Sequence, residues 1–242
     1  MMFEPLDKEK MAKLLKEIPS HFPLIVNLSH QKGGVGKSTL AYNIADAFRI
    51  LGFKVKLLDV DIQNTCGGLN GLREEPFTDI EKVSDERKLV ELINDSSTDG
   101  SEIIIIDTGG FDSALSRLAI MGSDINLTPV SDKVTEVLAV VQKYNQTLGE
   151  IESSTENRVS SYVLLNRIHP FAKHFGHIEE MIEDSTHMNM FKTIVKDRAI
   201  YDKSFIDGRT VFEASDLKGH EEAMDEILSV CYELIEMHVK KG

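Results

Sequence analysis

This chain of 242 residues has only two cysteines, Cys66 and Cys231, and they lie far apart. Neither belongs to a CxxC pair, so the sequence indicates neither a disulfide framework nor a cysteine-based metal site. Reduced thiols of the kind found in cytosolic proteins are the simpler interpretation. We therefore expect a cytoplasmic protein.

The sequence also lacks any run of about 18 apolar residues, so no segment is expected to span a membrane. Its N-terminus, Met1 to Lys16, mixes charges and has no apolar centre of a signal peptide. That stretch instead suits a short helix over Asp7–Ile18. Internal repeats and low-complexity linkers are missing too. We therefore expect a helical N-terminal extension, residues 1–22, and a single domain, residues 23–242.

Positive charge is in deficit. The chain has 27 lysines and arginines against 40 aspartates and glutamates, and its formal net charge is −13. A field of this sign does not favour coating nucleic acid, so any contact with DNA must come from a local basic patch. Hydrophobic residues make up 41% of the chain, and its length suits one large α/β domain with seven or eight strands.

The chain does contain a glycine-rich stretch, HQKGGVGKST, from His30 to Thr39. An apolar run, Pro23 to Leu28, precedes it, and a helical pattern, Leu40 to Leu51, follows it. This order of strand, glycine-rich turn and helix is that of a phosphate-binding loop. The backbone N–H groups of such a loop converge on one point, and the helix aims its positive N-terminus at the same point.

The residues of this loop have expected roles in binding ATP or ADP with Mg²⁺. Lys37 would reach the β- and γ-phosphates, and the Ser38 hydroxyl would hold the Mg²⁺ ion. The remaining loop contacts to the nucleotide are expected from Gly33, Gly34, Val35, Gly36 and Thr39.

The loop departs from the usual pattern because Gln31 stands where a glycine is expected and a second lysine, Lys32, precedes Gly33. KGGVGKST resembles the deviant Walker A motif of the ParA/MinD family of ATPases. In that family the extra lysine reaches across a dimer interface to the partner's nucleotide. The resemblance implies catalytic roles for Lys32 and Lys37, and a homodimer that forms with ATP.

Two further segments end in acidic residues. DVDIQ, which begins at Asp59, resembles the DxDxQ segment of the family. By that resemblance Asp59 helps hold Mg²⁺, and Asp61 positions the attacking water. Four consecutive isoleucines, Ile103–Ile106, predict a central parallel strand, and the following Asp107 fits a catalytic Walker B aspartate that orders Mg²⁺ through water. Gly109 and Gly110 would let the next turn move with the γ-phosphate.

These patterns predict an α/β fold of the P-loop NTPase type, with a doubly wound, mostly parallel sheet flanked by helices. The acids and Lys37 should then gather at the carboxyl ends of the strands. Other segments predict an irregular stretch with weak helix over Asn64–Asp85, an amphipathic helix over Val134–Leu148, a strand over Val159–Ile168 and a short strand over Met190–Val195.

Two polar features leave alternatives open. Asn166 lies at the end of a predicted strand, where the resemblance implies an adenine contact, but an asparagine there can equally satisfy loop backbone. His169, His174 and His177 are close in sequence, as zinc ligands would be, but no cysteine lies near them. A polar loop is the better interpretation of these histidines.

The resemblance extends to the C-terminal helix. The residues that carry it there are spaced as in small plasmid-partition ATPases, and they are Tyr201, Ser204, Gly208, Val211 and Glu213. It implies a ParA-like ATPase that binds DNA non-specifically as an ATP-bound dimer and segregates plasmid or chromosomal DNA. A centromere-binding partner protein would stimulate hydrolysis, and the protein would associate with the nucleoid. The candidate DNA contacts, interleaved with acids, are Lys192, Lys196, Arg198, Lys203, Arg209 and Lys218.

Three alternative functions stay open. One is a MinD-like regulator that acts at a membrane, and another is an ATPase that positions a protein machine rather than DNA. The third is metabolic, because amidotransferase-like and nitrogenase-like relatives share the loop, although Cys66 alone cannot supply the bridging cysteines of the nitrogenase type. The end of the chain shows neither the long apolar face nor the flanking positive charge that membrane binding requires. We therefore expect no membrane partner.

Overall fold

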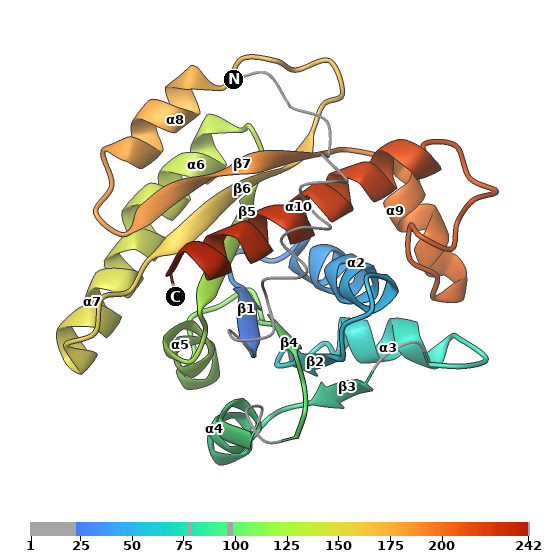
Figure 1. Ribbon diagram of the computed structural model, residues 1–242. Helices are drawn as coiled ribbons and strands as arrows, with labels where there is room; N and C mark the ends of the chain where they lie inside the picture. The colour runs from blue at the N-terminus through green and yellow to red at the C-terminus, as the bar shows by residue number, and fades with distance from the viewer. Residues whose placement is uncertain (1–22, 77–78, 96–98, 242) are drawn as a thin grey trace.

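The computed structural model describes residues 23–76, 79–95 and 99–241. They form a seven-stranded sheet in the order β3-β2-β4-β1-β5-β6-β7, with every neighbouring pair parallel (Figure 1). This confirms the expected doubly wound α/β fold. The strands are β1 (Leu24–Leu28), β2 (Val55–Asp59), β3 (Asp79–Lys82), β4 (Ile103–Asp107), β5 (Ile125–Val130), β6 (Ser161–Ile168) and β7 (Met188–Lys196).

Helices connect the strands and cover both faces of the sheet (Figure 1). The helices are α2 (Lys37–Ile50), α3 (Thr65–Gly71), α4 (Glu86–Asp95), α5 (Ala114–Met121), α6 (Val134–Ala139), α7 (Asn145–Thr155), α8 (Gly176–Glu183), α9 (Ala199–Ser204) and α10 (His220–Lys241). A π-helical turn, Val140–Tyr144, joins α6 to α7, and a 3₁₀ turn, Phe205–Asp207, follows α9.

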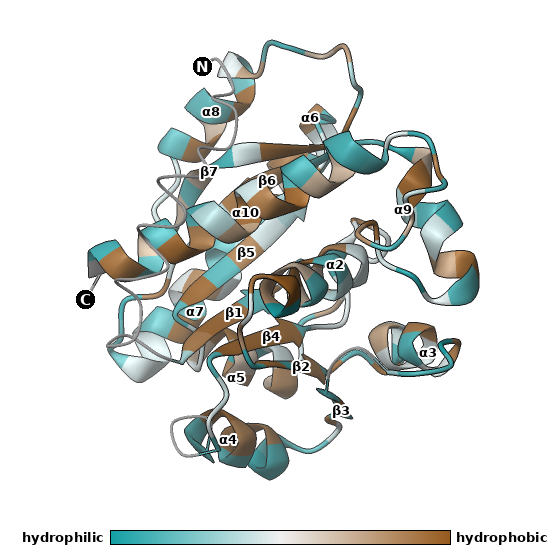
Figure 2. Ribbon diagram, turned by 45° about the vertical axis from the view of Figure 1, so that its right-hand side comes forward, coloured by the Kyte–Doolittle hydropathy of each residue, from teal (hydrophilic) through white to brown (hydrophobic). Residues whose placement is uncertain are grey.

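The four isoleucines of β4 show why its sequence is continuously apolar. Ile103 and Ile105 pack in the core formed with α2 and α10, whereas Ile104 and Ile106 pack in the core under α4 and α5. All four side chains are fully buried, because successive residues of a strand point to opposite faces and both faces are covered. Figure 2 shows the hydrophobic residues concentrated on these central strands.

Three of the expected elements differ from the structure. The prediction of an irregular stretch over Asn64–Asp85 was wrong in part, since it contains β3 as well as the short helix α3. β3 is an edge strand of half-exposed, mostly charged residues, so it shows no apolar alternation. The helix predicted over Val134–Leu148 continues to Thr155 through the π-helical turn, and the strand predicted over Met190–Val195 spans Met188–Lys196.

The helix expected over Asp7–Ile18 lies outside the described residues, as does the rest of the N-terminal extension. Within the described parts of the chain, no helix is both long enough and apolar enough to cross a membrane. The central strands end level with one another, because Asp107 pairs in register with Asp59 of β2 and with Leu28 of β1. The loop that follows β1 therefore starts beside both carboxylates.

Candidate functional site

The loop between β1 and α2 has the backbone of a phosphate-binding loop. Gly34 and Gly36 have φ angles of 76° and 95°, which lie in the left-handed region that glycine adopts without strain. Helix α2 begins at Lys37, and its N-cap residue, Gly36, has no side chain to cap the first N–H groups. The positive N-terminus of α2 is therefore available to an anion.

A pocket of about 520 Å³ opens at this end of α2. Its volume falls in the range of about 300–1,000 Å³ that is typical of small-molecule and cofactor sites. The phosphate-binding loop lines one side of it, and the ends of β6 and β7 line the other. The polar side chains that line it include Lys37, Ser38, Asp61, Gln63, Asn166, Arg167, Lys196, Asp197, Arg198 and Asp202.

Lys37 carries a buried amine into this pocket. The residue is only 5% exposed, and its Nζ donates to the carbonyl of Lys32 at 3.3 Å. Burial lowers the pKa of Lys37, while the carboxylates of Asp107 and Asp61 oppose that shift. A buried ammonium with one neutral acceptor is stabilised by an anion, as a phosphate would provide.

Asp107 is the most deeply buried acid of the site. The Ser38 hydroxyl donates to its carboxylate, and the Cys66 thiol lies 3.4 Å from its Oδ2. Its Oδ1 is buried and has no hydrogen-bond partner among the described residues. Burial raises the pKa of Asp107 to about 7, and the nearby Asp59 adds to the shift.

This arrangement fits a divalent cation. Among the described residues, one group of acids, cysteines and histidines is close enough to share an ion, and it consists of Asp59, Cys66 and Asp107. The ligand atoms of these three side chains lie within 4.8 Å of one another. The unpartnered Oδ1 of Asp107 and the hydroxyl of Ser38 are oxygen ligands of the kind that Mg²⁺ prefers.

Asp59 has a clear structural task in addition. Its carboxylate accepts hydrogen bonds from the backbone N–H groups of Asp61, Cys66 and Gly67 at 3.1, 3.0 and 3.3 Å. These contacts satisfy N–H groups in the first turn of α3 and hold the turn that carries Asp61. A direct or water-mediated role of Asp59 at Mg²⁺ remains a prediction.

Asp61 lies at the wall of the pocket, half-buried, and its Oδ1 accepts from the N–H of Gln63 at 3.1 Å. A Cβ added to Gly109 would lie 3.5 Å from this carboxylate. Asp61 therefore faces the turn that follows Asp107. Its position at the pocket suits the predicted role of orienting water, which stays a prediction.

The turn after β4 packs directly against the phosphate-binding loop. A Cβ on Gly110 would lie 2.7 Å from the backbone nitrogen of Gly33, closer than real Cβ contacts occur. Only glycine fits at this position with the loop as it stands. The backbone after β4 therefore lies directly against the loop, and the switch role expected of this turn stays a prediction.

Asn166 and Arg167, at the end of β6, both contact the phosphate-binding loop. The Asn166 amide donates to the carbonyl of Val35 at 2.8 Å, and the Arg167 guanidinium donates to the carbonyl of Gly34 at 3.0 Å. Asn166 thus satisfies loop backbone, as one of the two sequence interpretations expects. Its adenine contact remains a prediction.

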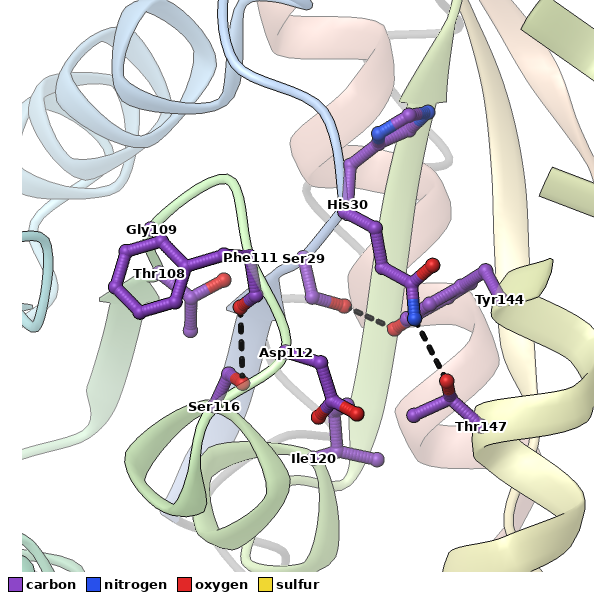
Figure 3. Close-up of a pocket in the computed structure, with 11 residues that line it drawn as sticks. Ser29, His30, Thr108, Gly109, Phe111, Asp112, Ser116, Ile120, Tyr144 and Thr147 are labelled. Atoms are coloured by element: carbon purple, nitrogen blue, oxygen red, sulfur yellow. Dashed lines mark hydrogen bonds between the residues drawn. The ribbon is translucent and has the colours of Figure 1, made fainter. Parts of the chain in front are cut away.

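A second, much smaller cavity lies behind the loop (Figure 3). Its volume is about 10 Å³, which is room for at most one water molecule. Tyr144, from the π-helical turn, is hydrogen-bonded to Ser29 here, and the Gln31 amide donates to Thr147 at 2.6 Å. These contacts anchor the start of the loop to helix α7 and its preceding turn, and the cavity is too small for a nucleotide.

Comparison with known proteins identifies this architecture. The family model described as an AAA domain matches residues 24–156, more than half of the chain. The protein ParA of Rhizobium radiobacter is 27% identical over 148 residues, which cover 60% of this chain and 65% of that protein. The chain belongs to the ParA/MinD family of ATPases. It spans less than two thirds of the length of this curated relative.

Solved structures of the family share the fold at low sequence identity. The MinD cell division protein of Aquifex aeolicus superposes with a TM-score of 0.65 at 17% identity, covering 86% of this chain and 97% of that one. MinD of Pyrococcus horikoshii, complexed with Mg-ADP, superposes with a TM-score of 0.62 at 14% identity, covering 86% and 96%. At these identities the likeness shows the fold alone.

The lysine that precedes the glycines of the loop, Lys32, is not among the residues that line the pocket. The Lys32 side chain is 64% exposed, and its Nζ lies 3.7 Å from the Glu136 carboxylate of α6. Glu136 itself is buried and accepts from the N–H and hydroxyl of Ser131 at 3.2 and 3.0 Å. Lys32 is therefore held within its own chain by a preoriented carboxylate.

Several of the candidate DNA-binding cations are engaged in the same chain. Arg198 pairs with Glu226 at 2.7 Å, and Arg209 pairs with Asp207 and Asp216 at 2.9 and 2.6 Å. The Lys196 ammonium donates to the carbonyl of Ala172 at 3.1 Å and lies 5.6 Å from the Phe175 ring centroid. The carboxylates in these ion pairs thus offset part of the positive charge that the C-terminal third of the sequence carries.

The three histidines that follow β6 do not form a group of metal ligands among the described residues. His169, His174 and His177 are exposed, and none belongs to the group of potential metal ligands found in the described residues. His169 and His174 lie in the loop between β6 and α8, and His177 lies in the first turn of α8. Conversely, sequence reasoning missed three contributors to the site: Cys66, Glu136 and Arg167. None lies in a motif, and only their neighbours in the folded chain mark them.

Proposed function

We propose that this protein is a ParA-like partition ATPase, which dimerises with Mg-ATP, binds DNA without sequence preference and segregates plasmid or chromosomal DNA. The observation that carries the proposal is the difference in burial between the two lysines of the loop. Lys37 is buried and lines the pocket, whereas the Lys32 side chain is 64% exposed. In this proposal Lys37 would bind the nucleotide of its own chain, and Lys32 would bind that of a partner.

Each step of ATP binding and hydrolysis has residues suited to it. Lys37 and the first N–H groups of α2 would hold the phosphates. Ser38 and the unpartnered Oδ1 of Asp107 would hold Mg²⁺, which supplies neutralisation of the phosphate charge when bound. Asp61, at the pocket wall, would orient the water that attacks the γ-phosphate. Phosphoryl transfer needs such positioning more than covalent chemistry.

ATP-dependent dimerisation tests the role assigned to Lys32. Sedimentation velocity of the Asp61→Ala protein, with and without Mg-ATP, should show a dimer only with the nucleotide. Adding Lys32→Ala to that background should weaken the dimer, because the cross-interface charge on the phosphates is lost. Lys88→Ala is a matched control, since Lys88 lies on α4 and pairs with Glu81. Equal dimerisation of the Lys32→Ala protein and its parent contradicts the proposal.

DNA binding needs the dimer because the single chain has a net charge of −13. Two copies of any basic patch facing one side would add their phosphate contacts through counterion release. Filter binding of the ATP-trapped dimer to random duplex DNA should therefore show sequence-independent retention that falls steeply as salt rises. A centromere-binding partner protein would then be sought by its stimulation of ATP turnover.

The second candidate is an ATPase that positions a protein machine rather than DNA. The ion pairs that Arg198 and Arg209 each form with carboxylates of the same chain favour this second candidate. A guanidinium group that is bound to a carboxylate contributes little to phosphate binding. Absence of DNA binding by the ATP-trapped dimer, even at low salt, would decide for this candidate. The nucleotide cycle at Lys32, Lys37 and Asp61 would be the same in both.

A further inference from the structure

We propose that Asn166 and Arg167 form a clamp that positions the phosphate-binding loop. The two residues fasten consecutive carbonyls of the loop, and thereby direct the following N–H groups toward the phosphates. The inference rests on the proposed function only in naming the ligand as a nucleoside polyphosphate. The contacts of the clamp themselves do not depend on that function.

The two contacts are made between segments far apart in sequence. Asn166 Nδ2 donates to the Val35 carbonyl at 2.8 Å in a buried position, and the two residues are 131 positions apart in the sequence. Arg167 Nη1 donates to the Gly34 carbonyl at 3.0 Å, and these two residues are 133 positions apart. Asn166 is 4% exposed, so its hydrogen bond is shielded from water. Both acceptors belong to the glycine-rich turn itself.

Peptide geometry gives these contacts their consequence. A trans peptide unit is planar, so the carbonyl of one residue and the N–H of the next point in opposite directions. Holding the Gly34 carbonyl orients the N–H of Val35, and holding the Val35 carbonyl orients the N–H of Gly36. Both N–H groups then point away from the clamp, which is the orientation a phosphate-binding loop uses.

The end of β6 is shaped to let two successive side chains reach the same loop. In a regular strand, side chains 166 and 167 would point to opposite faces. Here the pairing of β6 with β7 shifts register between Leu165 and Ile168, and Arg167 has a φ of 58°. A non-glycine residue in the left-handed region is strained, and such strain concentrates at functional sites.

The loop has a glycine, Gly36, at the position that lies against the Asn166 amide. A Cβ on Gly36 would lie 2.4 Å from Asn166 Nδ2, so the amide occupies the space that any side chain at Gly36 would need. Arg167 Nε also lies 3.9 Å from the carboxylate of Asp197, just beyond β7, in an exposed and therefore weak ion pair that lines the pocket. The clamp therefore joins the phosphate end of the pocket to the end formed by β6 and β7.

The test uses Asn166→Ala and Arg167→Ala, with Asn157→Ala and Arg158→Ala as matched controls. The control residues are exposed and lie shortly before β6. ¹⁵N relaxation of the nucleotide-free protein measures the order parameters of the Val35 and Gly36 amides. In wild type and controls we expect values near those of rigid backbone, about 0.85, and in each clamp variant a fall toward the flexible range, about 0.6.

Nucleotide affinity provides the second readout. Titration with a fluorescent ADP analogue should show about tenfold weaker binding for each clamp variant, the loss expected for one hydrogen bond. Arg167→Lys keeps a donor and should recover part of the loss. The melting temperature serves to separate positioning from folding, and we expect it to change no more than in the controls.

The outcomes separate this inference from the proposed function. Wild-type protein that binds no nucleotide would refute the proposed function, while the order parameters would still test the clamp. Clamp variants with wild-type order parameters and wild-type affinity would overturn the clamp and leave the proposed function standing. Weaker affinity that merely follows a lower melting temperature would likewise overturn it, because the contacts would then only support folding.

Discussion

The ammonium group of Lys32 lies 3.7 Å from the carboxylate of Glu136 in the same chain. A lysine that serves a second subunit must leave this partner when the dimer forms. Because Lys32 is largely exposed, the pair is worth only about 0–1 kcal/mol, so it is a weak restraint that nucleotide binding can overcome.

The first prediction concerns this restraint. Glu136→Gln keeps an acceptor for Ser131 and removes the charge that holds Lys32. We expect the ATP-dependent dimer to form at up to about fivefold lower protein concentration, in line with the small energy of the pair. Sedimentation velocity over a concentration series measures this. A dimer weaker than wild type would instead mean that Glu136 supports Lys32 across the interface.

The second prediction separates binding from hydrolysis. Lys37→Ala should lose nucleotide binding, because no other buried ammonium meets the phosphates at the N-terminus of α2 among the described residues. Asp61→Ala should keep ATP but lose turnover by about 100-fold or more, as expected when a water-orienting group is removed. Equilibrium binding and phosphate release measure the two effects. Unchanged turnover in Asp61→Ala would reject its role.

The third prediction is a pH dependence of stability that comes from His30. The ring is 5% exposed, its Nδ1 accepts from the N–H of Lys32 at 2.8 Å, and burial, followed by the charge of Lys37, lowers its pKa from 6.5 to about 4. The folded state thus binds fewer protons than the unfolded state between these values. Stability from this residue is complete above about 6.5 and falls as pH drops toward 4.

Asn at position 30 keeps an acceptor near the place of Nδ1 and cannot be protonated. Between pH 7.5 and pH 4, His30→Asn should lose about 2–3 kcal/mol less unfolding free energy than wild type. Urea unfolding at both pH values measures the difference, and carboxylates that titrate in both proteins cancel. Parallel pH profiles for the two proteins would show that His30 does not titrate in this way.

The fourth prediction uses two glycines of similar backbone conformation. Gly208 has a φ of 74°, and a Cβ there would lie 2.3 Å from the carbonyl oxygen of Leu69. Gly52 has a φ of 96° and no atom within 4 Å of its Cβ position. Gly52→Ala should cost about 1 kcal/mol from strain alone, and Gly208→Ala at least about 2 kcal/mol more, because backbone must shift.

Thermal and urea unfolding of the two alanine variants provide this comparison. The loop at Gly208 also holds helix α3, since Arg73 donates to the Gly208 carbonyl at 3.1 Å and to Glu213 at 2.6 Å. We therefore expect Gly208→Ala to loosen α3, which follows the turn of Asp61. Similar losses of stability in the two variants would show that the Leu69 contact is easily relieved.

Much of the fold and the centre of the site follow from local sequence. The stretch from Lys32 to Thr39 permits the loop conformation because Gly34 and Gly36 tolerate positive φ. Ile103–Ile106 predicted a strand covered on both faces, because four apolar residues in a row cannot alternate with solvent. Parallel strands then bring Asp59 and Asp107 side by side, which the register confirms.

The remaining features were decided by contacts between residues far apart in the chain. β3 forms because the edge of β2 offers hydrogen bonds to a charged segment with no strand pattern of its own. Asn166 and Glu136 meet Val35 and Lys32 only after the sheet has placed the ends of β5 and β6 beside the loop. Backbone conformation and burial pattern are local properties that sequence encodes directly, whereas the partner of a polar side chain depends on which surfaces folding brings together.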